Sequence, residues 1–173
     1  MELKMEKVAM FALFGIFAWW VIALLLAIFS TRPAQAASDL SPQQAMLLYT
    51  VAGGELGIGW PDKPPEIRPG MTQAQLTALV CPKTGNCRPR AAFLDGVVYL
   101  RNDMDFSQPY DSSVVAHEMV HYFQWWKRGG PAYSCQEWQA REEQAYAVQA
   151  RIMEKAGHDS TPVRVSMSYS ACK

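Results

Sequence analysis

Residues 111–127 decide the predicted fold, and they read DSSVVAHEMVHYFQWWK. N-cap candidates open this stretch at residues 111–113, and Gly-Gly-Pro follows it at residues 129–131, so the stretch predicts one helix. Apolar side chains recur on one face, which predicts that this face is anchored in a core while the opposite face looks into a cleft. The apolar face consists of Val115, Met119, Tyr122 and Trp126.

His117 and His121 are one turn apart on this predicted helix. Both imidazoles therefore project from the same face and can reach one metal ion at about 2.0 Å. Gln124 falls on the same stripe. Glu118 stands beside His121, where its carboxylate can take a proton from a metal-activated water instead of binding the metal. The alternative interpretation is a chance HExxH match on an ordinary buried helix.

The two histidines leave the predicted site one ligand short, because catalytic zinc takes three protein ligands and keeps a position for water. A metzincin would have glycine at position 124 and histidine at position 127. This chain has Gln124 and Lys127, which excludes that class. The third ligand must therefore come from another element.

Glu142 is the predicted third ligand, on the next helix. Ser134 and Glu137 form a capping-box pattern that opens this helix, which we expect to run through about Lys155. Glu142 is the acidic member of the apolar face, and a lone acid is costly to bury without a partner such as a metal ion. Glu143 is rotated by about 100° toward the charged side. The alternative is that Glu142 is an ordinary surface carboxylate.

These residues resemble the gluzincin metallopeptidases, whose pattern is HExxH on one helix and a glutamate ligand on the next. Residues 142–145 match the ExxA form of that second helix. The chain is also similar to small exported bacterial proteins of uncharacterised function that carry HExxHxxQ and then ExxAYxxQ, here residues 117–124 and 142–149. The resemblance covers residues 81–156. In the broader clan, the position one turn after the ligand glutamate is often aspartate, whereas this chain has Tyr146.

The resemblance implies one Zn²⁺ ion held by His117, His121 and Glu142. It also implies hydrolysis of amide bonds in a peptide or protein substrate, with Glu118 as general base and then proton shuttle. Tyr146 and Gln124 are candidates for supporting a ligand from the outer hydrogen-bond shell or for stabilising the oxyanion. Further oxyanion candidates are Tyr133 and His158.

Two rival functions remain open at this point. The protein could be a catalytically inert exported module, in which zinc holds two helices together or presents a partner-binding surface. Structural zinc usually has four protein ligands, and the sequence offers three. The same site could also hydrolyse a non-protein amide, such as a cell-wall crosslink. For a peptide substrate, strand 97–101 is expected to present an edge along which an extended chain adds.

Residues 1–36 are interpreted as a signal peptide or an N-terminal membrane anchor. An apolar run covers residues 8–29; lysines precede it, and an Ala-x-Ala cleavage pattern follows at residues 34–36. The run is longer than a usual signal core and long enough to span a bilayer of about 30 Å, so cleavage and retention both stay open. Residues 37–173 are then one exported domain, periplasmic or extracellular, possessing the metallopeptidase site.

Four cysteines lie in the part predicted to be exported, which favours disulfides in an oxidising compartment. We expect Cys81 to pair with Cys87 across a short loop and Cys135 to pair with Cys172, tying the C-terminal tail to the start of a helix. A cysteine-rich metal site is the alternative. The spacing of the first pair is wider than in structural zinc modules, which favours the disulfides.

The other elements complete an α+β prediction: mainly helical, with a small hairpin packed beside the HExxH helix and a second helix carrying the glutamate ligand. One helix is predicted from residue 43 to residue 51, stopped by a Gly-Gly pair, and another from Thr72 to Leu79. Residues 57–70 read as an irregular connection. Strands 90–94 and 97–101 flank the turn pair Asp95-Gly96. The net charge is zero and no cluster of basic residues is present, which excludes a nucleic-acid binder.

Overall fold

The computed structural model describes residues 39–81 and 87–168. The chain divides into two units, Met1–Ala36 and Ala37–Lys173, and only the second contains described residues. That unit has the predicted α+β fold, mainly helical with a three-stranded mixed sheet. The predicted leader or anchor at residues 1–36 lies outside the described residues.

Helix α4, Pro109–Arg128, carries the HExxH motif. It begins at least three residues earlier than the N-cap candidates 111–113 predicted, because Pro109 occupies the first turn, where its missing N–H costs nothing. Asp111 therefore lies inside the first turn, where it accepts hydrogen bonds from the side chain of Arg90 and the backbone N–H of Asp105. The helix ends as expected at Gly129, whose φ of 75° is readily adopted by glycine.

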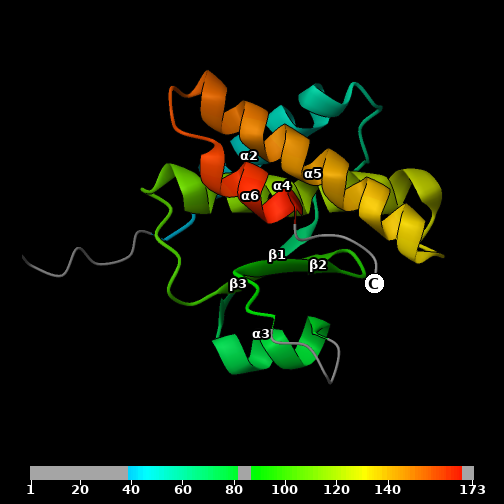
Figure 1. The fold of residues 1–173 in the computed structure, drawn as a ribbon, viewed down its shortest axis with the longest axis horizontal. Helices are drawn as coiled ribbons and strands as arrows, with labels where there is room; N and C mark the ends of the chain where they lie inside the picture. Colours follow the sequence, from blue (N-terminus) through cyan, green and yellow to red (C-terminus); the bar gives the residue numbers. More distant parts are fainter. Residues whose placement is uncertain (1–38, 82–86, 169–173) are drawn as a thin grey trace, which may run out of the picture. The chain divides into compact units, whose positions relative to one another are not determined.

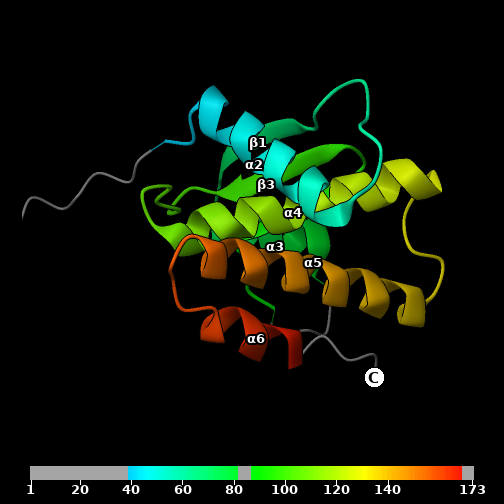
Figure 2. The same cartoon turned by 90° about the horizontal axis from the view of Figure 1, so that it is seen from above.

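Helix α5, Cys135–Lys155, carries Glu142 and returns along α4 (Figure 2). Ser134 caps it by accepting a hydrogen bond from the N–H of Glu137. The other half of the predicted capping box would be a hydrogen bond from the N–H of Ser134 to the side chain of Glu137. It is absent from the start of α5, which lies in the described part of the chain. The side chain of Glu137 instead accepts from the N–H of Tyr133 and pairs with Arg141.

The sheet contains β1, Glu66–Met71, β2, Ala91–Leu94, and β3, Val97–Arg101, in the order β1-β3-β2. Strands β2 and β3 form the predicted hairpin, and its turn residues Asp95 and Gly96 both have positive φ, as a type I′ turn requires. The expectation of an irregular connection over residues 57–70 is wrong for its last part, which forms β1.

Strand β3 lies in the middle of the sheet, between its antiparallel neighbour β2 and its parallel neighbour β1. The expectation that residues 97–101 present a free edge to a peptide is therefore wrong, because both of its sides are already paired. The edge strands are β1 and β2, and β2 is the one that packs on α4.

Helix α3, Gln73–Val80, lies on one side of the sheet, and α4 lies on the other (Figure 1). The predicted capping box is confirmed: Thr72 accepts from the N–H of Gln75, and the side chain of Gln75 accepts from the N–H of Thr72. Helix α2, Pro42–Leu56, packs on α4, and a helix that was not predicted, α6, Thr161–Ser168, packs on α5.

Helix α2 continues past residue 51 through the Gly-Gly pair that was expected to stop it. Gly53 is buried at a close approach between elements: a Cβ there would lie 2.7 Å from the rings of Phe123 and Trp60. The helix ends instead at Gly57, with φ 60°. Glycine at residue 53 is therefore a packing requirement and not a stop signal.

The core forms between α2, the sheet, α4 and α5, and the predicted apolar face of α4 supplies much of it. Val115, Met119 and Tyr122 are buried as expected. Trp126 is 42 % exposed, so its inclusion in the buried face is wrong. It lies near the end of α4, where its ring passes close to Gly59.

The prediction of a transmembrane helix is corrected here: none of the helices over residues 39–81 and 87–168 is long and apolar enough to cross a membrane. The apolar run 8–29, on which that prediction relied, lies outside the described residues.

A disulfide joins Cys81 and Cys87, which confirms the first predicted pair. Cys135 is also disulfide-bonded. Its predicted partner, Cys172, lies outside the described residues.

Candidate metal centre

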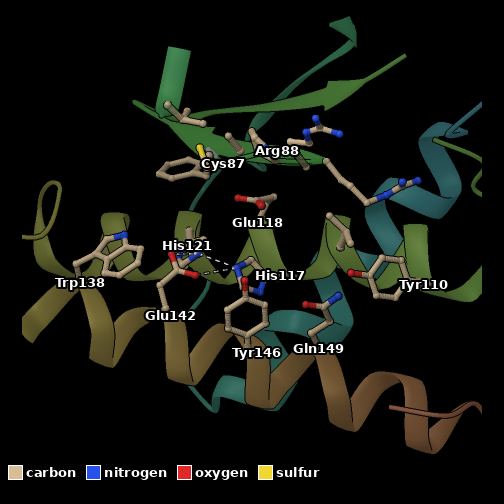
Figure 3. Close-up of a pocket in the computed structure, with 17 residues that line it drawn as sticks. Cys87, Arg88, Tyr110, His117, Glu118, His121, Trp138, Glu142, Tyr146 and Gln149 are labelled. Carbon is tan, nitrogen blue, oxygen red and sulfur yellow. Dashed lines mark hydrogen bonds and ion pairs between the residues drawn. The ribbon is translucent and has the colours of Figure 1, made fainter. Parts of the chain in front are cut away.

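The candidate centre lies where α4 faces α5, beneath β2 (Figure 3). The helical periodicity of α4 presents His117 and His121 toward α5, and Glu142 reaches them from α5. His117 is only 6 % exposed, and Glu142 is largely buried. Burial of three such polar groups together is costly unless they share a charged partner or a proton.

The ligand atoms lie at mutual distances that suit one metal ion. The Nε2 atoms of His117 and His121 are 3.0 Å apart. The carboxylate oxygens of Glu142 lie 3.4 Å from Nε2 of His117 and 3.2 Å from Nε2 of His121. Two donors bound to one tetrahedral zinc ion are about 3.3 Å apart, so this set of two imidazoles and one carboxylate fits zinc in both chemistry and spacing.

The neighbouring acid, Glu143, is not part of the centre. It is exposed on α5 and accepts a hydrogen bond from Gln139, one turn earlier on the same helix. The one-residue difference rotates its side chain by about 100°, away from α4. Of the two acids, it is therefore Glu142 that the structure brings to the histidines.

His121 and Glu142 strongly perturb each other's pKa. Burial lowers the pKa of His121, but the hydrogen bond and charge of Glu142 outweigh burial and raise that pKa to about 9. Burial raises the pKa of Glu142, yet hydrogen bonds from His117 and His121 hold it well below its usual range. Without a metal ion, a proton on His121 therefore balances the negative charge of the Glu142 carboxylate.

Glu118 lies beside the ligand group without joining it. Its side chain is directed toward β2, between the histidines and the sheet (Figure 3), and the residue is 6 % exposed. Burial raises the pKa of its carboxyl group, against the opposing effects of His117, His121 and the backbone N–H of Phe93. A carboxylate with raised pKa at this position is a suitable base for a water molecule near the histidines.

Gln124 orients His121 from the outer side of the centre. Its Oε1 atom lies 2.9 Å from Nδ1 of His121, so Nδ1 carries the proton and Nε2 is the free ligand atom. Its Nε2 atom donates to the backbone oxygen of Arg141 and to the side chain of Gln144. These hydrogen bonds join α4 to α5 next to His121.

The ring of Tyr146 packs against that of His117 at an interplanar angle of 58°, with ring centroids 4.4 Å apart. It occupies the helix position where the resembled family often has aspartate, and Nδ1 of His117 has no hydrogen-bond partner among the described residues. The other oxyanion candidates, Tyr133, which is 81 % exposed, and His158, do not line the cavity described next.

A cavity of about 500 Å³ opens onto the centre. β2 and the segment before it form one wall, and α4 and α5 form the other. Sequence reasoning missed several wall residues that tertiary packing brings here, although Gln149 ends the ExxAYxxQ pattern and so carried a signal. The missed residues are Arg88, Arg90, Tyr110, Val114, Trp138 and Gln149.

A second hollow of about 170 Å³ also reaches His121 and Glu142 of the centre. It is bounded by the end of β2 and by residues 131–132 in the connection between α4 and α5. Phe93, His121, Trp138 and Glu142 line both hollows. His121 and Glu142 therefore adjoin both hollows, whereas His117 lines the larger one.

The distances between the candidate ligand atoms thus agree with the ligand positions expected from the sequence. Comparison with known proteins gives no further information about the site. No protein-family model, no curated protein and no solved structure matches this chain.

Proposed function

We propose that the protein is a zinc-dependent hydrolase of peptide bonds, as its resemblance to the gluzincins implies. One observation carries the proposal: the Nε2 atoms of His117 and His121 and the carboxylate of Glu142 lie at ligand spacing beside the buried acid Glu118. The adjoining cavity is within the usual size range of ligand sites. The described metal-ligating group has three members, as a catalytic site has, whereas structural zinc usually has four protein ligands.

A bound zinc ion would supply Lewis acidity, polarising a carbonyl oxygen and lowering the pKa of a water ligand to about 7. Glu118 then accepts the proton of the attacking water and delivers it to the leaving amine. The raised pKa of Glu118 favours the first of these steps, because it makes the carboxylate a stronger base. Gln124 keeps His121 in the tautomer that leaves Nε2 free.

The substrate is proposed to lie along β2, the sheet edge beside the cavity. The N–H of Arg101 bonds to the carbonyl of Arg90, so the antiparallel register directs the backbone groups of Ala91 and Phe93 to the outer edge. Glu118 accepts from the N–H of Phe93. The remaining groups of this edge are available to an extended peptide, whose backbone they would bind as an added strand.

The test combines metal analysis with digestion of an unbiased peptide library. The zinc-loaded wild type and Glu118→Gln are expected to hold about one zinc ion each, and only the wild type should cleave, because glutamine cannot accept the proton. Glu143→Gln is the matched control, since it removes a neighbouring exposed acid from α5 and should both bind zinc and cleave.

Each contrary outcome has a distinct meaning. Zinc binding with equal, background-level hydrolysis by wild type and Glu118→Gln would favour the inert module. Cleavage of cell-wall crosslinks but not of peptides would keep the chemistry and change the substrate. Absence of zinc from all three proteins after loading would refute the metal centre.

We also propose that the protein works in an exported, oxidising compartment. The Cys81–Cys87 disulfide supports this location, because such bonds persist outside the reducing cytosol. Free thiols at Cys81 and Cys87 in protein isolated from its native compartment would contradict it.

A further inference from the structure

Gln149 is a buried polar residue of the cavity that the proposed hydrolysis does not use. It is only 2 % exposed, yet its side chain lines the cavity on the side of His117 away from Trp138 (Figure 3). Its helix, α5, also carries Glu142, so its position relative to the candidate ligands is fixed by the helix itself.

A hydrogen-bond relay fixes which atom of Gln149 faces the cavity. The hydroxyl of Ser113 donates to the backbone oxygen of Tyr110 at 2.7 Å, so that hydroxyl can only accept from Gln149. The Nε2 atom of Gln149 makes this donation at 3.0 Å. The amide is therefore not free to flip, and its other end, Oε1, is held as an acceptor.

The Oε1 atom of Gln149 has no hydrogen-bond partner among the described residues, and it is not among their fully buried unpartnered atoms. It thus opens to the cavity. The Tyr110 hydroxyl also lacks a hydrogen-bond partner within the described part of the chain, and it points into the same side of the cavity (Figure 3). Val114 supplies an apolar wall beside them.

We propose that Gln149 and Tyr110 form a subsite that selects a neutral carboxamide on the substrate, such as a glutamine or asparagine side chain. Oε1 of Gln149 accepts from the carboxamide N–H, and the Tyr110 hydroxyl donates to its oxygen. A carboxylate would place two acceptors against each other at Gln149; of the two arginines that line the cavity, Arg90 is already paired with Asp111 and Arg88 is exposed in the segment before β2. An ammonium group would meet one neutral acceptor at Gln149 and no unpaired anion beside it, because Asp111 is paired with Arg90 and the side chain of Glu118 is directed toward β2.

This subsite rests on the proposed function only for its effect on cleavage, so binding is tested separately. The probes are the N-acetyl, N-methylamide derivatives of glutamine, norleucine and glutamate. They are added to the protein with and without zinc while the side-chain amide signals of Gln149 are followed by NMR. Those signals are assigned by their loss in Gln149→Met.

The glutamine probe is expected to shift these signals and to bind roughly tenfold more tightly than the norleucine probe, the order expected from lost hydrogen bonds. Gln149→Met should remove that preference. Gln136→Met, which changes an exposed glutamine of the same helix, should keep it. Tyr110→Phe should weaken glutamine binding without affecting norleucine, and it serves as the second variant if Gln149→Met does not fold.

Equal shifts with all three probes, no shift at saturating glutamine probe, or a preference that survives Gln149→Met would overturn the subsite. Peptide cleavage without a glutamine or asparagine preference at any position would do the same while leaving the hydrolase intact. Conversely, a glutamine-specific shift in a protein that cleaves no peptide would support the subsite and count against the proposed activity.

Discussion

Glu142 and Glu143 are adjacent acids with opposite surroundings, and this contrast makes a direct test of the metal centre. Loss of a group that only supports a metal ligand lowers metal affinity by up to about 100-fold. Glu142→Gln removes a direct ligand, so we expect it to lower zinc affinity by more than that. Glu143→Gln should leave affinity within about twofold, as for other exposed sites away from a metal. Competition with a chelating dye measures both. Loss of zinc from the Glu143 variant alone would contradict the assignment.

His121 makes zinc binding dependent on pH. With a pKa of about 9 in the metal-free protein, its imidazole is protonated at pH 7 and must lose that proton to bind zinc. We expect His121 to release about one proton per zinc at pH 7, beyond any proton lost by a water ligand of the metal, and zinc affinity to rise by at least roughly tenfold per pH unit up to pH 9.

Calorimetry in buffers of different ionisation enthalpy counts these protons. His158→Gln is the control, because that exposed histidine lies outside the site cavity and should not alter the proton count. A count near zero at pH 7, or an affinity that falls as pH rises, would show that His121 is neutral before zinc arrives.

The site residues that sequence predicted are those governed by one helical period. His117 and His121 share a face because they are four residues apart, and Glu142 was separated from Glu143 by the same rule. Tyr133 and His158, which residue type alone had suggested as oxyanion candidates, do not line the cavity. Gln149 was overlooked because its meaning depends on Ser113, a residue of another helix.

At the scale of elements, the Gly-Gly pair of α2 offers a test of close packing. Gly53→Ala should lower the free energy of unfolding by about 1–3 kcal/mol, because its Cβ would collide with the fully buried ring of Phe123. Gly54→Ala should raise it by about 0.5–1 kcal/mol, because nothing lies within 4 Å of the added Cβ and alanine favours the helix. Urea unfolding of both variants measures the difference. Stabilisation by both would refute the close approach.

Elements with local signals were predicted well, whereas those set by distant partners were not. The hairpin of β2 and β3 was evident from Asp95-Gly96 because a turn pair and its flanking strands are neighbours in sequence. Strand β1 carries Pro69 and mostly exposed side chains, so it lacks an alternating pattern. It becomes a strand through parallel pairing with β3. The wrong edge assignment for residues 97–101 follows from missing that partner.

At the scale of the whole molecule, zinc should act as a clamp between α4 and α5. Binding to the folded state alone contributes about 2.7 kcal/mol at a zinc concentration 100 times the dissociation constant. That should raise the melting temperature by roughly 5–10 °C for a chain of this length. Thermal unfolding with and without zinc measures the shift. A similar rise in Glu142→Gln would mean that zinc binds elsewhere.

The ion pairs of Glu55 with Arg151 and Lys155 join α2 to the end of α5, across sequence separations of 96 and 100 residues. The candidate ligands, by contrast, come from two successive helices. Contacts between successive elements close small loops and form early in folding, whereas distant pairings form late. We therefore expect α4 and α5 to assemble first and α2 to dock on them last. Nascent chains would then acquire a metal-binding hairpin before the surrounding domain is complete.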